Sequence, residues 1–170
     1  MIDKLCFREK VDFDIQKSVC FTGHRQVDRD FDYKNFENLL EKLIEKGYEY
    51  FFIGMALGFD TICFRLLEGL RESYKHIKLI ACIPCKEQDK KFNVEQKQIY
   101  KNMVDNADYK VLINQSYTPY CMQERNAFMV DNSSLVIAYM LRNYGGTFNT
   151  VSYALRTGKK VYNIVNKLGL

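Results

Sequence analysis

The chain has 170 residues, of which 47% are hydrophobic and 27% are charged. This length suits one domain with its own core, and the presence of only two prolines argues against long disordered linkers. The formal net charge of +4 is small, and basic residues alternate with acidic ones, so the composition disfavours an extended nucleic-acid-binding face.

The first residues are interrupted by charges and lack the apolar core of a signal peptide. No apolar run approaches the ~20 residues that a membrane-spanning helix needs. We therefore expect a cytoplasmic protein that does not enter a membrane.

Six cysteines are present, and among them only Cys82 and Cys85 are closely spaced, as Cys-Ile-Pro-Cys. A zinc site would need a second such pair, so no metal is expected. A redox-active pair would be expected within a thioredoxin-like pattern, which the surrounding sequence lacks. Free thiols in a reducing compartment are the favoured interpretation.

Short apolar runs alternate with helical patterns from residue 18 onward. We predict strands at residues 18–21, 50–53, 77–83, 109–113, 134–140 and 160–165. Helices are predicted at 33–46, from about 61, at 94–106, at 119–130 and from 145–146 to 158. Asp60 is expected to be an N-cap, and Pro119 is expected in a first helical turn.

This alternation predicts an α/β, Rossmann-like fold: a mostly parallel sheet of about six strands with helices on both faces. Residues 1–17 show no clear period, and we expect them to form an N-terminal arm that could carry a short edge strand. Residues 18–170 are expected to form a single domain.

Glycine-rich segments follow three of the predicted strands. They are Thr22-Gly23-His24-Arg25, residues 54–60 with the sequence Gly-Met-Ala-Leu-Gly-Phe-Asp, and Tyr144-Gly145-Gly146-Thr147. Ligands of open α/β sheets bind beyond the carboxyl ends of the strands, and helix starts there favour anions. Each segment alone is equally compatible with a plain turn, but three at one sheet edge favour a phosphate-binding site. Arg125, inside a predicted helix, has on local grounds the pattern of a solvated surface residue.

Taken in order, these segments resemble the YpsA-type branch of the SMF/DprA–LOG (SLOG) superfamily. The resemblance also uses Pro84 with Gln88, and Met122-Gln123-Glu124-Arg125-Asn126, and it extends from about Ser18 to Val165. It implies a Rossmann-like fold that binds nucleotides at the glycine-rich turns, with no further cofactor. The ligand-binding residues it implies, together with those of the turns, are Thr22, Gly23, His24, Arg25, Gly54, Ala56, Gly58, Asp60, Pro84, Gln88, Arg125, Asn126, Gly145, Gly146 and Thr147.

The phosphoribohydrolases of this superfamily carry the motifs Met-x-Glu-Arg-Lys and Pro-Gly-Gly-x-Gly-Thr-x-x-Glu. Here Asn126 replaces the lysine of the first motif, and Thr150 stands where the catalytic glutamate of the second should be. Glycosidic cleavage needs a carboxylate or similar group, which threonine does not supply. The sequence therefore leans against an enzyme, although Asp60 or Asp131 offers another carboxylate.

Three functions remain in view. The first is a binding protein that senses or sequesters a nucleotide-derived ligand, such as an ADP-ribose-like molecule or a cyclic nucleotide. The second is a nucleotide N-glycosidase or phosphoribohydrolase, and the third is DprA-like binding of single-stranded DNA, which the charge distribution disfavours. The resemblance also leads us to expect a homo-oligomer.

Overall fold

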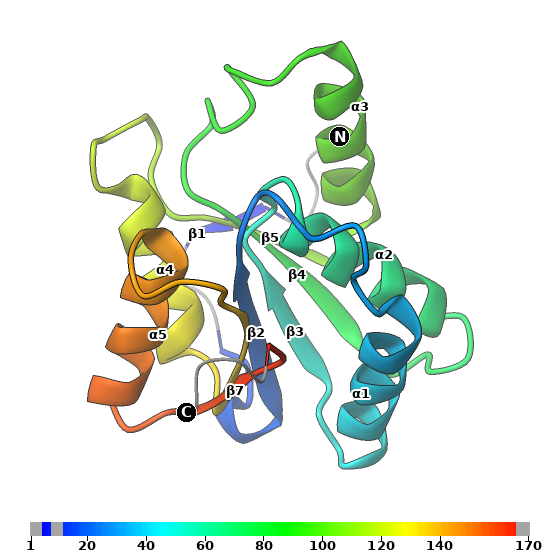
Figure 1. The fold of residues 1–170 in the computed structure, drawn as a ribbon. Coiled ribbons are helices and arrows are strands. Elements are labelled where there is room, and N and C mark those ends of the chain that lie inside the picture. Colours follow the sequence, from blue (N-terminus) through cyan, green and yellow to red (C-terminus); the bar gives the residue numbers. More distant parts are fainter. Residues whose placement is uncertain (1–4, 8–11, 166–170) are drawn as a thin grey trace.

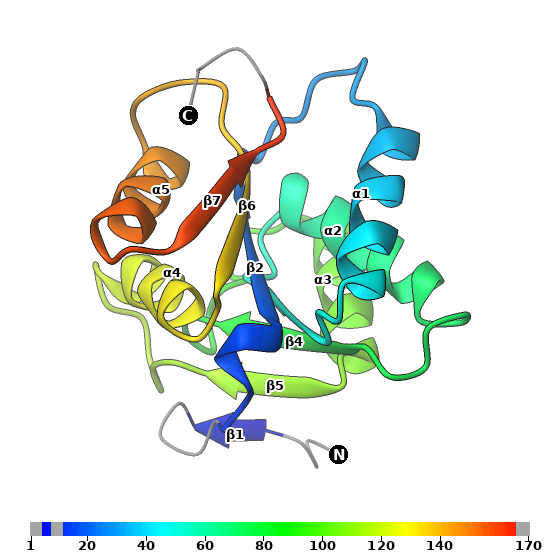
Figure 2. The same ribbon diagram turned by 90° about the horizontal axis from the view of Figure 1, so that it is seen from below.

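A computed structural model describes residues 5–7 and 12–165. Its centre is one sheet with the strand order β1-β5-β4-β3-β2-β6-β7, in which every neighbouring pair is parallel (Figures 1 and 2). The strands are β1 (Leu5–Phe7), β2 (Ser18–Gly23), β3 (Tyr50–Ile53), β4 (Lys78–Ile83), β5 (Tyr109–Leu112), β6 (Leu135–Tyr139) and β7 (Lys160–Asn163). The helices are the 3₁₀ turn η2 (Ile15–Lys17), α1 (Tyr33–Glu45), α2 (Phe59–Leu70), α3 (Val94–Asn106), α4 (Cys121–Asp131) and α5 (Gly146–Arg156).

Helices cover both faces of the sheet, as the continuous apolar strands predict. Successive strand residues point to opposite faces, so Phe51 and Ile53 of β3 join one core while Phe52 between them joins the other. The first core is completed by α1, α2 and α3, and the second by α4 and α5. Figure 1 shows the same division, with α1 to α3 on one side of the strands and α4 with α5 on the other.

The chain changes direction across the sheet between β2 and β6, which lie side by side with Gly23 opposite Tyr139. From β2 the chain continues outward through β3, β4 and β5, and it then returns to β6 and β7 on the far side of β2. Such a switch point leaves a crevice beyond the carboxyl ends of the two central strands. The fold therefore places the segments after β2 and after β6 next to each other.

The predicted α/β, Rossmann-like fold with a parallel sheet is confirmed, and the bounds of its elements agree with expectation to within two residues. Beyond the six predicted strands, β1 lies in the segment expected as an arm and pairs with β5 at the sheet edge. Among the described residues, no helix is both long enough and apolar enough to cross a bilayer.

Two local predictions were wrong. Asp60 is not an N-cap, because α2 begins one residue earlier and Gly58 occupies the cap position, while the Asp60 carboxylate accepts the Ala56 N–H at 3.1 Å. Pro119 lies before α4, not in its first turn. The Cys121 N–H donates to the Thr118 carbonyl at 3.2 Å, so a turn at this point delays the helix to Cys121.

Gly58 lies between β3 and α2 and packs against the segment that follows β2. Its φ of +82° lies in the left-handed region, and a Cβ at this position would collide with the backbone carbonyl of Arg25. The next residue, Phe59, donates its N–H to the His24 carbonyl at 3.1 Å. Only glycine lets the two backbones approach this closely.

We predict that Gly58→Ala lowers the free energy of unfolding by at least ~2 kcal/mol, because it adds a backbone collision to a strained φ. Gly69→Ala is the matched control: Gly69 lies in α2 with open space around its Cβ position, so alanine should stabilise the helix by ~0.5–1 kcal/mol. Urea unfolding followed by circular dichroism measures both. A Gly58→Ala variant as stable as the wild type would contradict the assigned contact.

Candidate functional site

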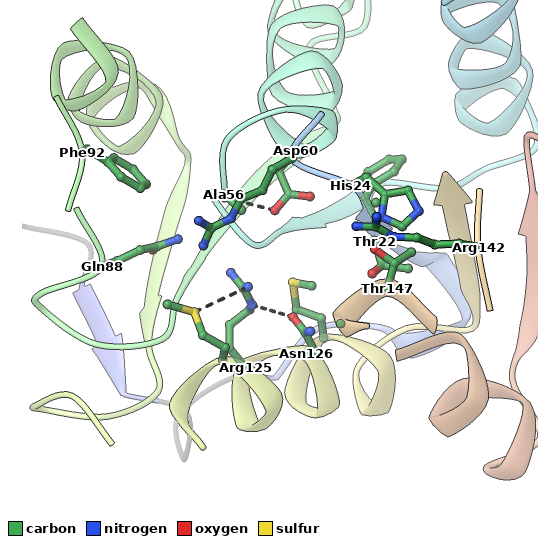
Figure 3. A pocket seen from close by; sticks show the side chains of 16 residues that line it. Thr22, His24, Ala56, Asp60, Gln88, Phe92, Arg125, Asn126, Arg142 and Thr147 are labelled. Atoms are coloured by element: carbon green, nitrogen blue, oxygen red, sulfur yellow. Dashed lines mark hydrogen bonds between the residues drawn. The ribbon is translucent and has the colours of Figure 1, made fainter. Parts of the chain in front are cut away.

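A cavity of about 260 Å³ opens at the carboxyl edge of the sheet, close to the lower end of the ~300–1,000 Å³ typical of small-molecule sites. Segments after β2, β3, β4 and β6 reach it, and α4 forms its floor as seen in Figure 3. Its lining residues are Phe21, Thr22, Gly23, His24, Arg25, Ala56, Asp60, Gln88, Phe92, Met122, Arg125, Asn126, Met129, Arg142, Gly146 and Thr147.

Most of the residues expected at the site line this single cavity. Four do not: Gly54 lies behind the wall, Gly58 supports the neighbouring turn, Pro84 does not line the cavity, and Gly145 lines an adjoining groove between α4 and α5. The cavity thus brings together Arg25 and Gly146, which lie more than a hundred positions apart in the sequence.

Arg125 is the central side chain of the site, and it is only 6% exposed. Its Nη1 donates to the Gly54 carbonyl, its Nε donates to Asn126 Oδ1 at 2.7 Å, and its Nη2 lies 4.0 Å from the Met122 sulfur. Burial lowers the pKa of the guanidinium, and the nearby Asp60 carboxylate opposes this shift. A buried charge requires such hydrogen bonds to be tolerated, so the expectation of a solvated surface arginine was wrong.

Gly54 is required where the guanidinium meets β3. A Cβ at this position would collide with Arg125 Nη1 and would lie 2.9 Å from Asp60 Oδ2. The space that a side chain would occupy is therefore filled by the arginine. The absence of a Cβ lets a buried cation lie directly against the end of a central strand.

Asp60 lies opposite Arg125 in the first turn of α2 and is likewise 6% exposed. Burial raises the pKa of its carboxyl, while the positive charge of Arg125 and the hydrogen bond from the Ala56 N–H act in the opposite direction. Among the ion pairs of the described residues, none joins these two side chains within 4 Å. Both groups therefore line the cavity without direct pairing.

His24 lies at the end of the cavity opposite Gln88 and Phe92 (Figure 3). The Leu141 N–H donates to His24 Nε2 at 3.0 Å, so the neutral ring carries its proton on Nδ1. Burial and the positive charge of Arg142 lower the pKa of the imidazole, and Asp28 offsets this in part. The ring is consequently held neutral and in one orientation beside the segment that follows β6.

The start of α5 adds backbone donors. Gly145, at φ +88°, occupies the N-cap position without a capping side chain, so the N–H groups of the first turn have no acceptor from a cap. Thr147 follows in that turn and is buried at the cavity wall. This geometry suits an anion, because the positive end of the helix dipole and free N–H groups coincide.

Asn126 connects the two helices beneath the cavity. Its Oδ1 accepts from Arg125 and its Nδ2 donates to the Thr150 hydroxyl at 2.9 Å, while that hydroxyl donates to the Gly146 carbonyl at 2.9 Å. Thr150 is buried and does not line the cavity. The position of the hydrolase glutamate thus has a role in holding α4 to α5.

Sequence reasoning missed several lining residues, notably Phe92 and Arg142. Phe92 ends a polar stretch after β4, and Arg142 directly follows Leu141, the backbone donor that fixes His24. A helical spacing offered one usable signal: Met122, Arg125 and Met129 recur on one face of α4. The loop positions carry no such period.

The cysteine pair of the sequence is not the pair in space. Cys82 and Cys85 are both free and buried, and Cys85 instead faces Cys121 of α4 with 3.9 Å between the sulfurs. Burial raises the pKa of the Cys85 thiol to about 11, so it is not a ready nucleophile. Within residues 5–7 and 12–165, no group of three metal-ligating side chains is arranged to hold an ion.

A model described as the YspA SLOG family matches residues 20–164, which include every residue that lines the cavity. The chain belongs to the YspA SLOG family. The resemblance drawn from the sequence is thereby confirmed.

Relatives of this SLOG chain differ in length. It is 36% identical over 132 residues to the SPbeta prophage-derived protein YoqJ of Bacillus subtilis, covering 70% of this chain and 77% of that protein. It is 30% identical over 118 residues to a UPF0398 protein of Brevibacillus brevis, covering 66% of this chain but 61% of the relative. The fold is similar to DNA processing protein A from Helicobacter pylori, with a TM-score of 0.63 at 17% identity, over 89% of this chain and 66% of that one.

Asp60 predicts a pH dependence of stability. Because its pKa is raised by folding, the protonated carboxyl stabilises the native state, and that contribution is lost as pH rises from the ordinary value of about 3.9 through the raised one. The Asp60→Asn variant should not lose stability in this way, because an asparagine side chain does not ionise. Urea unfolding from about pH 4 to about pH 7 should therefore show the wild type losing stability relative to the variant.

Asp105→Asn serves as the matched control. Asp105 has a lowered pKa through its hydrogen bond to Lys101, so its contribution to stability is lost as pH falls, with the opposite sign. If the wild type and Asp60→Asn had parallel stability curves across this range, the assigned burial of the carboxylate would be wrong.

Proposed function

We propose that this chain binds a phosphate-containing, nucleotide-derived ligand in the cavity at the carboxyl edge of its sheet. The observation that carries the proposal is the charge of the lining. Three arginines, Arg25, Arg125 and Arg142, face one carboxylate, Asp60. With the neutral His24 beside them, the lining has a positive balance that suits an anion of small size.

The donors are arranged for phosphate in particular. The Arg125 guanidinium has five N–H groups, which is more than the number of acceptors it bonds within the described residues. It therefore has donors left for a ligand. Arg142 lines the cavity from an exposed position, with its guanidinium carbon 4.9 Å from the centre of the Tyr144 ring. Together with the first turn of α5, these groups offer the forked and backbone hydrogen bonds that phosphate oxygens accept.

The ligand class follows from the remaining lining. Asp60 supplies an acceptor for a ribose hydroxyl, and Phe92 supplies an aromatic surface for a base. An ADP-ribose-like molecule or a cyclic nucleotide combines these three parts. Binding in order to sense or sequester such a molecule is the function we favour, because Thr150 cannot replace a catalytic carboxylate and its hydroxyl is engaged with Asn126 and Gly146.

Arg142→Met tests the proposal, because Arg142 is exposed and its loss should not affect folding. We expect at least roughly tenfold weaker binding of a nucleoside monophosphate or of ADP-ribose, since charge-assisted hydrogen bonds contribute ~1.5–3 kcal/mol. Arg125→Met should weaken binding further, with its folding checked by circular dichroism. Calorimetry and thermal shift measure both, since a bound ligand raises the melting temperature.

Arg65→Met is the matched control, because Arg65 is exposed on α2 and lies outside the cavity. It should bind every nucleotide as the wild type does. The proposal fails if no nucleotide of the panel raises the melting temperature of the wild type. It also fails if Arg142→Met and Arg125→Met bind as tightly as the control. Release of free base from a nucleoside monophosphate, lost in Arg125→Met, would instead favour the hydrolase alternative.

Single-stranded DNA binding is the second candidate, favoured by the fold likeness to DNA processing protein A, a protein whose solved structure concerns its single-stranded DNA binding mode. Its signature is affinity that falls steeply with salt, because phosphate contacts release counterions. Anisotropy of a labelled oligothymidylate across a salt series decides between the candidates. Tight, salt-sensitive binding that survives Arg142→Met would place DNA outside the cavity.

A further inference from the structure

A second space adjoins the cavity, in the groove between α4 and α5. Its volume is about 430 Å³, against about 260 Å³ for the cavity itself. The two helices that form its sides pack next to each other on one face of the sheet (Figures 1 and 2). Three residues line both spaces, namely Met122, Asn126 and Gly146. The groove therefore directly borders the proposed binding site.

Gly146 lies where the two spaces meet, and no side chain obstructs it. It is exposed, and a Cβ at this position would have no atom within 4 Å. Gly145, which lines the groove, is likewise exposed with open space at its Cβ position. The two glycines thus leave room for a ligand to pass from the cavity across the start of α5 into the groove.

The backbone donors of α5 lie at this same border. Within the described chain, the first N–H of the helix that has a backbone acceptor is that of Asn149, which donates to the Gly145 carbonyl at 3.0 Å. The N–H groups of Gly146 and Thr147 precede it and are available to a ligand. A phosphate bound to them would lie between the two spaces, so that a group esterified to it could extend to either side.

The groove has the lining of a nucleoside site and not of a second phosphate site. Apolar and amide side chains make up most of it: Met122, Gln123, Asn126, Ala127, Asn149 and Tyr153. Arg156 is the only charged residue in the lining, and its guanidinium carbon lies 5.5 Å from the centre of the Tyr153 ring. That ring is partly exposed, and its hydroxyl donates to Asp131 at 2.9 Å, which holds it in place. An aromatic ring beside a guanidinium offers a base a surface on which to stack.

We infer that the ligand is a dinucleotide: one nucleoside occupies the cavity, the second occupies the groove, and the phosphates that join them lie at the start of α5. The inference rests on the proposed function, because it takes the phosphate to bind at the first turn of that helix. A cyclic mononucleotide would leave the groove empty. The volumes support the longer ligand, since the cavity alone is smaller than the ~300–1,000 Å³ typical of small-molecule sites and the groove brings the site into that range.

Three nucleotides test this assignment by calorimetry on the wild type. They are adenosine 5′-monophosphate, adenosine 5′-diphosphate and diadenosine diphosphate, of which the second adds only a phosphate and the third adds a nucleoside as well. We expect diadenosine diphosphate to bind at least roughly fivefold more tightly than either mononucleotide, because stacking of one base on an aromatic side chain contributes that factor or more. Diadenosine diphosphate carries no more negative charge than adenosine 5′-diphosphate, so charge cannot produce this preference.

Ala127→Phe should remove the preference. Ala127 is partly exposed on α4 and lines the groove but not the cavity, so a phenylalanine there fills the space that the second nucleoside needs. The affinity for diadenosine diphosphate should fall to that for the monophosphate, whose unchanged binding shows that the variant is folded. Ala127→Ser is the matched control, because serine leaves the groove open, and it should bind all three nucleotides as the wild type does.

Arg156→Met tests the groove independently of any change in its volume. Arg156 is exposed and lies outside the cavity, so its loss should not affect folding. We expect it to weaken the binding of diadenosine diphosphate alone, by roughly two- to fivefold, since that is the contribution of an exposed cation to a contact with an aromatic ring.

The outcomes separate this inference from the function on which it rests. Equal binding of the two diphosphates by the wild type, or a preference that survives both Ala127→Phe and Arg156→Met, overturns the dinucleotide assignment while nucleotide binding stands. Binding of none of the three overturns both. The assignment is also wrong if sedimentation shows that Ala127→Phe converts a dimer to a monomer while the wild type has no preference, because the groove is then an interface between copies of this chain.

Discussion

One buried contact organises this site: the guanidinium of Arg125 against the carbonyl of Gly54 at the end of β3. A charge removed from water is tolerated only when hydrogen bonds replace those it made with solvent. Asn126 and Asp60 contribute to that environment from α4 and α2, one by a hydrogen bond and the other by its charge. The cation is thereby fixed against the carboxyl end of β3, where it lines the cavity.

The packing around this contact leaves no room for a side chain at three glycine positions. Gly23 lies against Phe59, Gly54 against Arg125, and Gly58 against the Arg25 carbonyl, and a Cβ at any of the three would collide with its neighbour. These glycines stand at the carboxyl ends of neighbouring strands or directly before α2, so they bring the segments after β2 and β3 together. This close packing sets the positions of Arg25 and Asp60, while Arg125 is also held by the side chain of Asn126.

The fold was largely predictable because its signals are local. Doubly covered strands give apolar runs such as residues 50–53, and helices give a period that includes Leu40 and Leu43, so strand order along the chain suggested a parallel sheet. The glycine-rich segments were found for the same reason, since a turn with a positive φ leaves a mark in the sequence at Gly58 and Gly145.

The candidate site was less predictable because burial of a polar group depends on what lies across the fold. Arg125 has ordinary neighbours in sequence, and its burial follows from the missing side chain at Gly54, 71 positions away. Asp60 has the sequence pattern of an N-cap, but the cap position belongs to Gly58, which lies against the Arg25 backbone. Phe92 and Arg142 lie on loops, where no periodicity shows which way a side chain points.

The two walls of the cavity differ in how freely they can vary. One wall is supported by Gly23, Gly54 and Gly58, where a Cβ would collide with the Phe59 side chain, the Arg125 guanidinium and the Arg25 carbonyl, so substitution there would force these neighbours to move. The other wall is made of side chains, including Gln88 and Phe92, on the loop that follows β4. Under the proposed function, mutation of the side-chain wall would change which molecule is accepted while the wall supported by the glycines stays constant, so a fold divided in this way can diversify its ligands without losing stability.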